Sequence, residues 1–384
     1  MMKESSFYTK LYEGNSSTEK AVQCNLCGRM CKIVNEGLGF CKTQKNIDGK
    51  LFSINYQRIA SYHIDPIEKK PLYHFLPGSS TYSIGGFGCN FSCLNCQNYM
   101  LSMNSFNEFN STKILPETIV KNAINDNCLS ISWTYNEPTL YFDFARETSL
   151  ISHRENLKNV YVSNGYMSEE SLDETLKFID AFNIDLKFFD DRLYREICGG
   201  KLDIVLDNLK AIHQSGSHLE ITTLLINDLN TDEDHIRSIC NFVLEELGEE
   251  VPIHFSRFFP MHKMSDESPT KIDFLLRAKE IAVDMGIEYV YLGNMPADNN
   301  SYCPNCGELL IARERYCNSD KKRIKDGHCL SCGHELNFIL EWWFSCQLNR
   351  RYMSCIICPW IWKTVHKSNL SFYCNVCLLN HLKK

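Results

Sequence analysis

The sequence predicts an α/β fold: a full or partial (β/α) barrel, preceded by a cysteine-rich N-terminal module and followed by a C-terminal zinc-ribbon-like module. Two observations carry this prediction. From residue 80 to about 297, β-rich runs alternate with amphipathic helical stretches, and the runs are nearly continuously apolar, as in a covered parallel sheet. Cysteine clusters flank this region, at residues 24–41 and 303–332. A doubly wound open sheet is the alternative.

The alternating region divides into strands and helices in a regular order. Strands are expected at residues 82–86, 130–135, 159–163, 182–188, 219–226, 253–258 and 289–292. Helical patterns follow at residues 119–124, 172–179, 206–212 and 236–247. For the last helix, Thr270 with Asp273 resembles a capping box, and Gly286 is expected to end it.

Three thiols follow the first strand within eight residues: Cys89, Cys93 and Cys96. Three thiolates are one too few for an ordinary four-cysteine site, and the next cysteine is Cys128. If the three bind a four-iron cluster, the fourth iron keeps an open position for an exchangeable ligand. The alternatives are a zinc site with a distant fourth ligand, and three reduced thiols without metal.

Polar side chains recur where the predicted strands end. Active residues of a (β/α) barrel gather at the carboxyl ends of its strands. The residues at these ends are Asn136 and Glu137 after the second strand, Asn164 after the third, Asp185 and Lys187 at the fourth, and His254 on the sixth. Placement on successive strands favours a pocket over isolated caps or surface groups.

The flanking cysteines have the spacing of closed metal sites. Cys24, Cys27, Cys31 and Cys41 suit structural zinc or a second iron–sulfur cluster, with a metal-free set as the alternative. Cys303, Cys306, Cys329 and Cys332 form two C-x2-C knuckles, each followed by glycine, which indicates a zinc ribbon rather than an auxiliary cluster. The basic residues between the knuckles are interpreted as a solvated surface. Cys128, Cys198, Cys240, Cys317 and Cys346 are interpreted as isolated core or surface thiols.

Composition places the chain among cytoplasmic globular proteins. The 384 residues carry a net charge of -7, which gives no sign of a nucleic-acid or membrane-surface binder. Neither a signal peptide nor a membrane-spanning run is expected. Twenty cysteines in a reducing compartment favour metal ligation over disulfides.

Four segments are predicted from these patterns. They are residues 1–79, a cysteine-rich module with an ordered connection at 64–75; residues 80–297, the barrel; residues 298–340, the ribbon; and residues 341–384, a tail rich in cysteine and tryptophan. The tail's Cys355, Cys358, Cys374 and Cys377 permit a second ribbon, but its composition equally suits a segment foreign to the rest.

The C-x3-C-x2-C loop is typical of radical S-adenosylmethionine (SAM) enzymes, and the region from about Cys24 to His334 resembles one family more specifically. It looks like the radical SAM enzyme of the AmmeMemoRadiSam system, a clade close to pyruvate formate-lyase activating enzymes. The residues that carry the resemblance are the N-terminal cysteines and the stretches at 67–75, 88–93, 96–98, 135–139, 163–165, 185–187 and 303–307.

The resemblance implies a role for each polar residue at the strand ends. Cys89, Cys93 and Cys96 would hold a [4Fe-4S] cluster that reductively cleaves SAM to a 5′-deoxyadenosyl radical, and this radical abstracts hydrogen from the substrate. The stretch from Tyr135 to Glu137, including Asn136, takes the place of a Gly-Gly-Glu segment that receives the SAM amino group, with bulkier residues where glycines are usual. Asn164, Asp185 and Lys187 would face the SAM carboxylate, and His254 the ribose. Asn95 departs from the aromatic residue usual before the last cluster cysteine.

Three functions remain open on the sequence. One is hydrogen abstraction from a small molecule alongside the other AmmeMemoRadiSam proteins, with ferredoxin or flavodoxin as electron donor. The second is activation of a glycyl-radical enzyme. The third, of another class, is a non-enzymatic zinc scaffold for protein or RNA, which would need neither an open coordination site nor a polar barrel rim.

Overall fold

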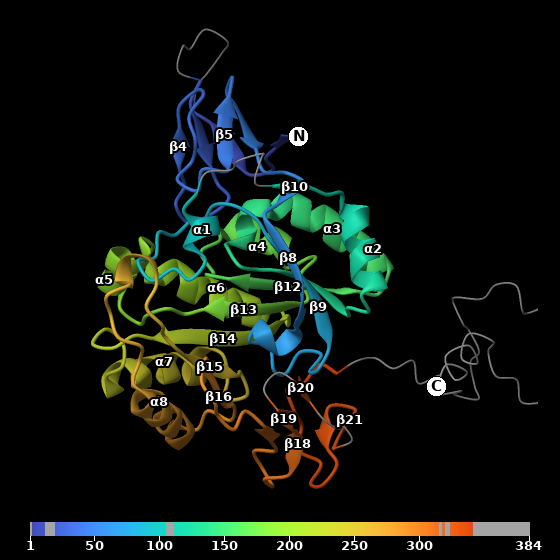
Figure 1. The fold of residues 1–384 in the computed structure, drawn as a ribbon, viewed down its shortest axis with the longest axis vertical. Helices are drawn as coiled ribbons and strands as arrows, with labels where there is room; N and C mark the ends of the chain where they lie inside the picture. Colours follow the sequence, from blue (N-terminus) through green and yellow to red (C-terminus); the bar gives the residue numbers. More distant parts are fainter. Residues whose placement is uncertain (1, 12–19, 105–110, 315–316, 319–322, 341–384) are drawn as a thin grey trace, which may run out of the picture. The chain divides into compact units, whose positions relative to one another are not determined.

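An eight-stranded sheet lies at the centre of the computed structural model, which describes residues 2–11, 20–104, 111–314, 317–318 and 323–340. The strand order is β16-β15-β14-β13-β12-β11-β9-β8 (Figure 1). All pairings from β9 to β16 are parallel, and β8 is antiparallel to β9. The strands are β8 (Ser61–Pro66), β9 (Ser80–Gly85), β11 (Ser130–Trp133), β12 (Lys158–Ser163), β13 (Ala181–Asp185), β14 (His218–Leu225), β15 (Ile253–Arg257) and β16 (Val290–Gly293).

The seven predicted strands are therefore confirmed, and the barrel is a partial one. Within the described residues β8 and β16 do not pair, so the sheet stays open. The strand order follows the sequence without reversal, which differs from a doubly wound sheet, where the order reverses at a switch point. Strand β8 falls within the stretch predicted to be the connection, and this strand extends the sheet by one antiparallel edge.

Helices follow the parallel strands. They are α2 (Pro116–Asn125), α3 (Phe142–Arg154), α4 (Glu169–Thr175), α6 (Leu202–Gln214), α7 (Glu233–Glu246) and α8 (Ile272–Met285). Helix α3 was not among the predicted helices. Gly286 ends α8 in a left-handed conformation, as expected, with φ of 107°.

The predicted capping box at the start of α8 is wrong. Lys271 is the N-cap, and it makes no side-chain cap bond. The Thr270 hydroxyl instead donates to the Leu225 carbonyl at 2.5 Å and accepts from the Phe258 amide at 3.1 Å. Thr270 therefore ties together the ends of β14 and β15, because those buried backbone groups also need partners.

The N-terminal module consists of two small antiparallel sheets. One contains β1 (Lys3–Glu4), β6 (Lys50–Ser53) and β5 (Gln44–Ile47), and the other β2 (Tyr8–Lys10), β3 (Val22–Cys24) and β4 (Lys32–Ile33). Its buried residues Val22 and Leu26 belong to the same hydrophobic core as Met167 beside the central sheet. A β-bridge also joins Cys27 to Met167. The module thus packs directly on the barrel.

The ribbon shares a second core with the barrel. Its hairpins are β17 (Ser301–Tyr302) with β18 (Leu309–Ile311), β19 (Arg313–Glu314) with β20 (Cys317–Asn318), and β21 (Ile324–Lys325) with β22 (His328–Cys329). Tyr73, Tyr289 and Tyr291 pack in this core with ribbon residues such as Ile311 and Cys329. Both appended modules are therefore fused to the barrel by buried contacts.

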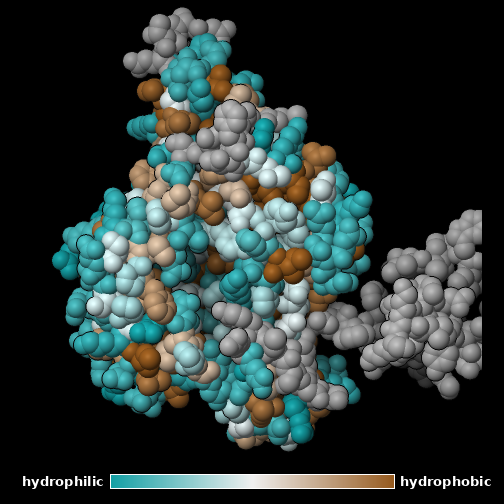
Figure 2. Space-filling view, in the orientation of Figure 1, coloured by the Kyte–Doolittle hydropathy of each residue, from teal (hydrophilic) through white to brown (hydrophobic). Residues whose placement is uncertain are grey.

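The described residues up to Leu340 form one compact unit. The predictions made for the tail lie outside the described residues. Among the described residues, no helix combines the length and the apolar character needed to cross a bilayer. The face shown in Figure 2 is mostly hydrophilic, with hydrophobic residues in small separate patches.

Candidate active site

A cavity of about 1090 Å³ opens at the carboxyl ends of the parallel strands. All nine residues predicted for the cluster and for SAM line it: Cys89, Cys93, Cys96, Asn136, Glu137, Asn164, Asp185, Lys187 and His254. The carboxyl ends of parallel strands meet at one edge of a sheet, which is why residues spread over 166 positions converge. The structure thus brings together every residue predicted for this site.

The loop with the three cysteines leaves β9 through a glycine that no other residue could replace without strain. Gly88 has φ of 81°, and a Cβ atom there would lie 2.3 Å from the Cys41 carbonyl oxygen. Farther along, the Ser92 and Leu94 amides donate to the Cys198 and Ile197 carbonyls, each at 2.9 Å. Backbone hydrogen bonds therefore hold the middle of the loop.

Asn136 anchors the start of this loop from the next strand. Its Oδ1 accepts from the Gly86 amide at 3.0 Å, and its Nδ2 donates to the Gly88 carbonyl at 2.7 Å. The Asn136 side chain also contacts the Tyr141 hydroxyl. Both Nδ2 hydrogens are thus used within the protein, so Asn136 can offer a ligand only acceptor groups and its backbone.

Glu137 joins the ends of β11 and β12. Its Oε1 accepts from Ser163 Oγ at 2.8 Å and from the Thr139 hydroxyl and amide, and its Oε2 accepts from the Asn164 amide at 2.9 Å. Burial raises the pKa of Glu137, although these four hydrogen bonds oppose the rise. A carboxylate oxygen has two lone pairs, so Oε2 retains capacity for one further donor.

Tyr135 occupies a backbone conformation that favours glycine. Its φ is 72°, and its ring lies over Gly85, where a Cβ atom would come within 2.9 Å of it. The Tyr135 hydroxyl donates to Asp65 Oδ2 at 2.7 Å, and Lys70 Nζ lies 4.7 Å from the ring centroid. These contacts hold a bulky residue in a strained conformation next to the cavity.

Asn164 lies against the cysteine loop. Its Nδ2 donates to Asn90 Oδ1 at 2.7 Å and lies 3.8 Å from Cys89 Sγ. Its Oδ1 accepts from the Tyr166 amide at 3.0 Å. The amide therefore connects the end of β12 to the loop that carries the thiols.

Asp185 and Lys187 form an ion pair on the cavity wall, with Nζ 2.8 Å from Oδ2. Burial alone would lower the pKa of Lys187, but attraction from Asp185, Cys93 and Cys198 holds this pKa well above its usual value. Lys187 is therefore a permanent cation next to the cysteine loop. A carboxylate ligand would find a matching charge there.

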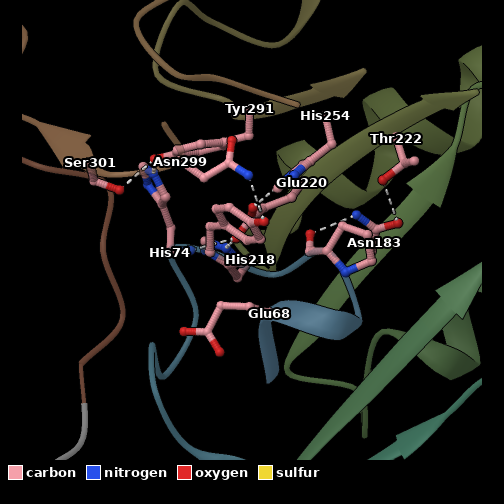
Figure 3. Close-up of polar contacts among 12 residues, drawn as sticks. Glu68, His74, Asn183, His218, Glu220, Thr222, His254, Tyr291, Asn299 and Ser301 are labelled. Atoms are coloured by element: carbon pink, nitrogen blue, oxygen red, sulfur yellow. Dashed lines mark hydrogen bonds and ion pairs between the residues drawn. The ribbon is translucent and has the colours of Figure 1, made fainter. Parts of the chain in front are cut away.

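His254 is oriented by a buried carboxylate that the sequence analysis missed (Figure 3). Glu220 Oε2 lies 2.6 Å from His254 Nε2, and Glu220 Oε1 lies 3.0 Å from His218 Nε2 and 2.7 Å from the His74 amide. Burial alone would raise the pKa of Glu220, but hydrogen bonds from the two histidines hold it well below its usual value. The signal was a His-x-Glu pair on one face of a strand.

A second group of buried polar side chains extends from Glu220 to the ribbon (Figure 3). His74 Nε2 lies 2.7 Å from the Tyr291 hydroxyl, which lies 2.5 Å from Ser301 Oγ. Arg313 of the ribbon donates to Ser301 Oγ at 2.8 Å, to the Asn299 carbonyl at 3.0 Å, and to the Tyr73 carbonyl at 2.6 Å. Its guanidinium also lies 4.7 Å from the Tyr73 ring centroid. Arg313 lines the cavity, so the ribbon forms part of the cavity wall.

Cys198 is a buried core thiol, as expected, but it also lies beside the cysteine loop. It ends a π-helical turn, Tyr194–Cys198, and its carbonyl accepts from the Ser92 amide. Its thiol lowers the pKa of Cys93. The π-turn, a feature frequent at functional sites, brings this thiol to the loop, and the sequence carries no signal for such a turn.

The thiols fit metal binding to different degrees. Those of Cys303, Cys306, Cys329 and Cys332 all lie within 4.8 Å of one another, with Cys303 and Cys332 3.6 Å apart and Cys306 and Cys329 3.8 Å apart. This is the only group of that kind within the described part of the chain. The four N-terminal thiols do not form a group as compact as that of the ribbon. They still affect one another, because Cys27, Cys41 and Cys31 add to burial in raising the pKa of Cys24.

The donor set of the cavity suits an iron–sulfur cluster with SAM. Soft thiolates are the ligands that such clusters take, and three line this cavity. The cation Lys187, the remaining acceptor capacity of Glu137 and the amide of Asn164 match the carboxylate and ammonium groups of an amino acid.

Comparison with known proteins agrees with this geometry. The model of the radical SAM superfamily matches residues 83–243. The uncharacterized protein MJ0808 of Methanocaldococcus jannaschii is 40% identical over 344 residues, which are 88% of this chain and 100% of that protein. The chain belongs to the radical SAM superfamily. Enzymes of this superfamily use a [4Fe-4S] cluster and SAM.

Two other relatives of the radical SAM chain carry specific descriptions. A probable GTP 3′,8-cyclase of Methanococcus aeolicus is 23% identical over 58% of this chain and 78% of that protein. A (2S)-3-sulfopropanediol dehydratase activating enzyme of Klebsiella oxytoca is 21% identical over 38% of this chain and 46% of that protein. The relatives therefore include more than one radical SAM activity.

Proposed function

We propose that this radical SAM enzyme binds its [4Fe-4S] cluster through Cys89, Cys93 and Cys96 and acts on a substrate held in the same cavity. The observation that carries the proposal is the convergence of the three thiols and the six predicted SAM contacts on one cavity. When bound, the cluster supplies the electron that splits SAM into methionine and a 5′-deoxyadenosyl radical.

The protein's own residues then bind and orient SAM. Lys187 offers a fixed positive charge to the SAM carboxylate, and Asn164 offers an amide beside the cysteine loop. Glu137 Oε2 accepts from the SAM ammonium. His254 faces the ribose, with its ring fixed by Glu220. Glu137, Asn164 and His254 are buried, which strengthens their polar contacts with a ligand.

The volume and lining of the cavity favour a small-molecule substrate beside SAM. Its volume of about 1090 Å³ reaches the upper end of the ~300–1,000 Å³ range usual for small-molecule pockets, so a second molecule can bind beside SAM. Away from the cysteine loop the lining includes Tyr73, Asn299 and Arg313. We therefore propose that the chain is the radical SAM member of the AmmeMemoRadiSam system, working in the cytoplasm with a ferredoxin- or flavodoxin-type electron donor.

A second candidate is activation of a glycyl-radical enzyme. It is favoured by the partial similarity to the Klebsiella oxytoca activating enzyme. This candidate requires a glycyl radical on a partner protein, formed in stoichiometric amount with 5′-deoxyadenosine. Electron paramagnetic resonance (EPR) of the partner distinguishes it from small-molecule chemistry.

We further propose that the ribbon cysteines bind zinc. Tetrahedral zinc with Zn–S bonds of about 2.3 Å places its sulfur atoms about 3.8 Å apart. The separations of 3.6 Å and 3.8 Å between the ribbon thiols agree with this value. Metal analysis of the purified chain, with Cys306→Ser for comparison, tests the assignment.

The deciding experiment is reductive cleavage of SAM. The chain is purified without oxygen, its cluster is reconstituted with iron and sulfide, and 5′-deoxyadenosine is quantified after addition of SAM and a strong reductant. Native protein should form the nucleoside, and Cys93→Ala should form none. A protein with a fully loaded cluster that forms no nucleoside would contradict the proposal.

A further inference from the structure

The N-terminal cysteine module contacts the cysteine loop of the active site through three separate groups. Cys41 presents its carbonyl to Gly88, where a Cβ atom would lie 2.3 Å away. Arg29, which lies between Cys27 and Cys31, donates to the Asn90 carbonyl and to the Gly199 carbonyl, the latter at 2.5 Å. The third contact is made by the side chain of Asn90, which belongs to the cysteine loop itself. Every one of these contacts involves one of the four cysteines or a residue between them.

Asn90 connects the N-terminal module to the predicted SAM site. Its Nδ2 donates at 3.3 Å to the Tyr166 carbonyl, which also accepts from the amide of Gly28, the residue after Cys27, at 3.1 Å. Its Oδ1 accepts from Asn164 Nδ2 at 2.7 Å and lies 3.8 Å from Cys89 Sγ. Asn90 is completely buried, so no water can replace these partners. A single amide therefore links the carbonyl that holds the Cys27 turn to the loop that carries Cys89.

Arg29 connects the same module to the turn that supports the loop. Gly199 follows the π-turn, whose Cys198 carbonyl accepts from the Ser92 amide. One guanidinium thus bridges the cysteine loop and the turn packed against it. Because Arg29 is only two residues from each of its cysteine neighbours, its position depends on the order of that segment.

We propose that Cys24, Cys27, Cys31 and Cys41 bind a metal centre, and that this centre fixes the geometry of the catalytic cysteine loop through Asn90 and Arg29. Three of these thiols are buried and Cys31 is partly exposed. The shared chemistry is thiolate ligation, which either one zinc ion or one iron–sulfur cluster satisfies. The inference rests on the proposed function for the catalytic loop.

The test compares full-length native protein with Cys31→Ser and Arg29→Ala after anaerobic reconstitution. Arg195→Ala is the matched control, because Arg195 is exposed and lies on the same π-turn. Iron, sulfide and zinc are measured per chain. Native protein should contain one thiolate centre beyond the catalytic cluster and the ribbon metal, and Cys31→Ser should lose it. The lost element, iron or zinc, identifies the centre.

The effect of the N-terminal centre on the cysteine loop is measured in the loop itself, and not through activity alone. Amide hydrogen exchange in residues 88–98 should accelerate on the order of tenfold in Arg29→Ala and in Cys31→Ser, because each loses restraints worth one or two hydrogen bonds. The EPR signal of the reduced catalytic cluster on SAM addition should change in both variants, and in neither respect should the control differ from native protein. Circular dichroism confirms that the variants fold.

Two results would overturn the proposal: native protein without an additional metal centre, or native exchange and EPR behaviour in both variants. Failure of the proposed function is a separate result, because it would appear as native protein that forms no 5′-deoxyadenosine. The exchange measurement on the loop remains interpretable in that case, since it requires no turnover.

Discussion

The N-terminal module and the ribbon are both small, cysteine-rich and packed on the barrel, yet they contribute to the active site in different ways. Each inserts one arginine that donates to backbone carbonyls. Arg29 of the N-terminal module is partly exposed and supports the cysteine loop. Arg313 of the ribbon has a fully buried side chain and lines the cavity itself. The arginine of the N-terminal module therefore supports the predicted cofactor site. The arginine of the ribbon forms a wall of the substrate space.

Removing the zinc proposed for the ribbon should have the largest effect on this arrangement. Cys303 and Cys329 share a core with Tyr73 and Tyr291, so loss of the metal should unfold the ribbon and expose those tyrosines. Near-ultraviolet circular dichroism should show the loss of tyrosine packing after chelation, while far-ultraviolet signal from the barrel persists. An unchanged tyrosine signal in metal-free protein would contradict the shared core.

Arg313→Ala should destabilise the chain by ~3–5 kcal/mol, because it removes the cation 4.0 Å from the buried Glu68 carboxylate and the donor to the buried Tyr73 carbonyl. Arg323→Ala is the matched control: that side chain is 60% exposed and pairs with Glu308 at 3.4 Å, so its loss should cost ~0–1 kcal/mol. Urea unfolding monitored by circular dichroism measures both. Equal effects would mean that Arg313 is not the anchor.

Acid should lower the free energy of unfolding through protonation of His74, which packs against the end of the ribbon. Burial lowers the pKa of His74 to about 3, and its ring stacks on Phe338 with centroids 3.7 Å apart. The unfolded chain therefore binds this proton at a higher pH than the folded chain. Stability is full above about pH 6.5 and is lost as pH falls toward 3, by ~1.4 kcal/mol per unit. His74→Phe should flatten this dependence between pH 6 and 4 in urea titrations.

Arg29→Ala should cost less than Arg313→Ala, about 1–2 kcal/mol, because the side chain is partly exposed and water can replace it. The same urea titration compares the two. A cost equal to that of Arg313→Ala would remove the distinction drawn between the modules.

Tyr135→Phe should give the smallest effect, about 1 kcal/mol, by removing the hydroxyl that donates to Asp65. Asp65 keeps Lys69 and Lys70 as partners, at 2.9 Å and 2.7 Å, so its charge stays compensated. This variant sets the baseline for losing one hydrogen bond near the cavity. A much larger loss in thermal unfolding would show that the strained backbone at Tyr135 depends on that bond.

Much of the architecture could be predicted because its causes are local in sequence. Apolar runs predicted all seven parallel strands, and the rule that strand ends converge placed residues as distant as Cys89 and His254 on one cavity. The spacing of the ribbon cysteines likewise predicted four thiols in one group. Whether the nine cavity residues perform their predicted roles stays a prediction.

Other features depend on contacts between distant segments, which a single sequence does not display. In the sequence, Glu220 is only a polar residue within an apolar strand. The fold places His74, His218 and His254 around it. Cys198 reads as a lone thiol until a π-turn carries it to Cys93. Thr270 had the pattern of a helix cap, but two strand ends compete for its hydroxyl.

The ribbon's position has a consequence for how this chain can diversify. Arg313 and Glu314 lie on a ribbon strand and also line the cavity. A ribbon transplanted from a related chain would therefore carry a piece of the binding wall with it. Substrate preference could then shift through recombination of an appended module, while the barrel that binds SAM keeps its sequence.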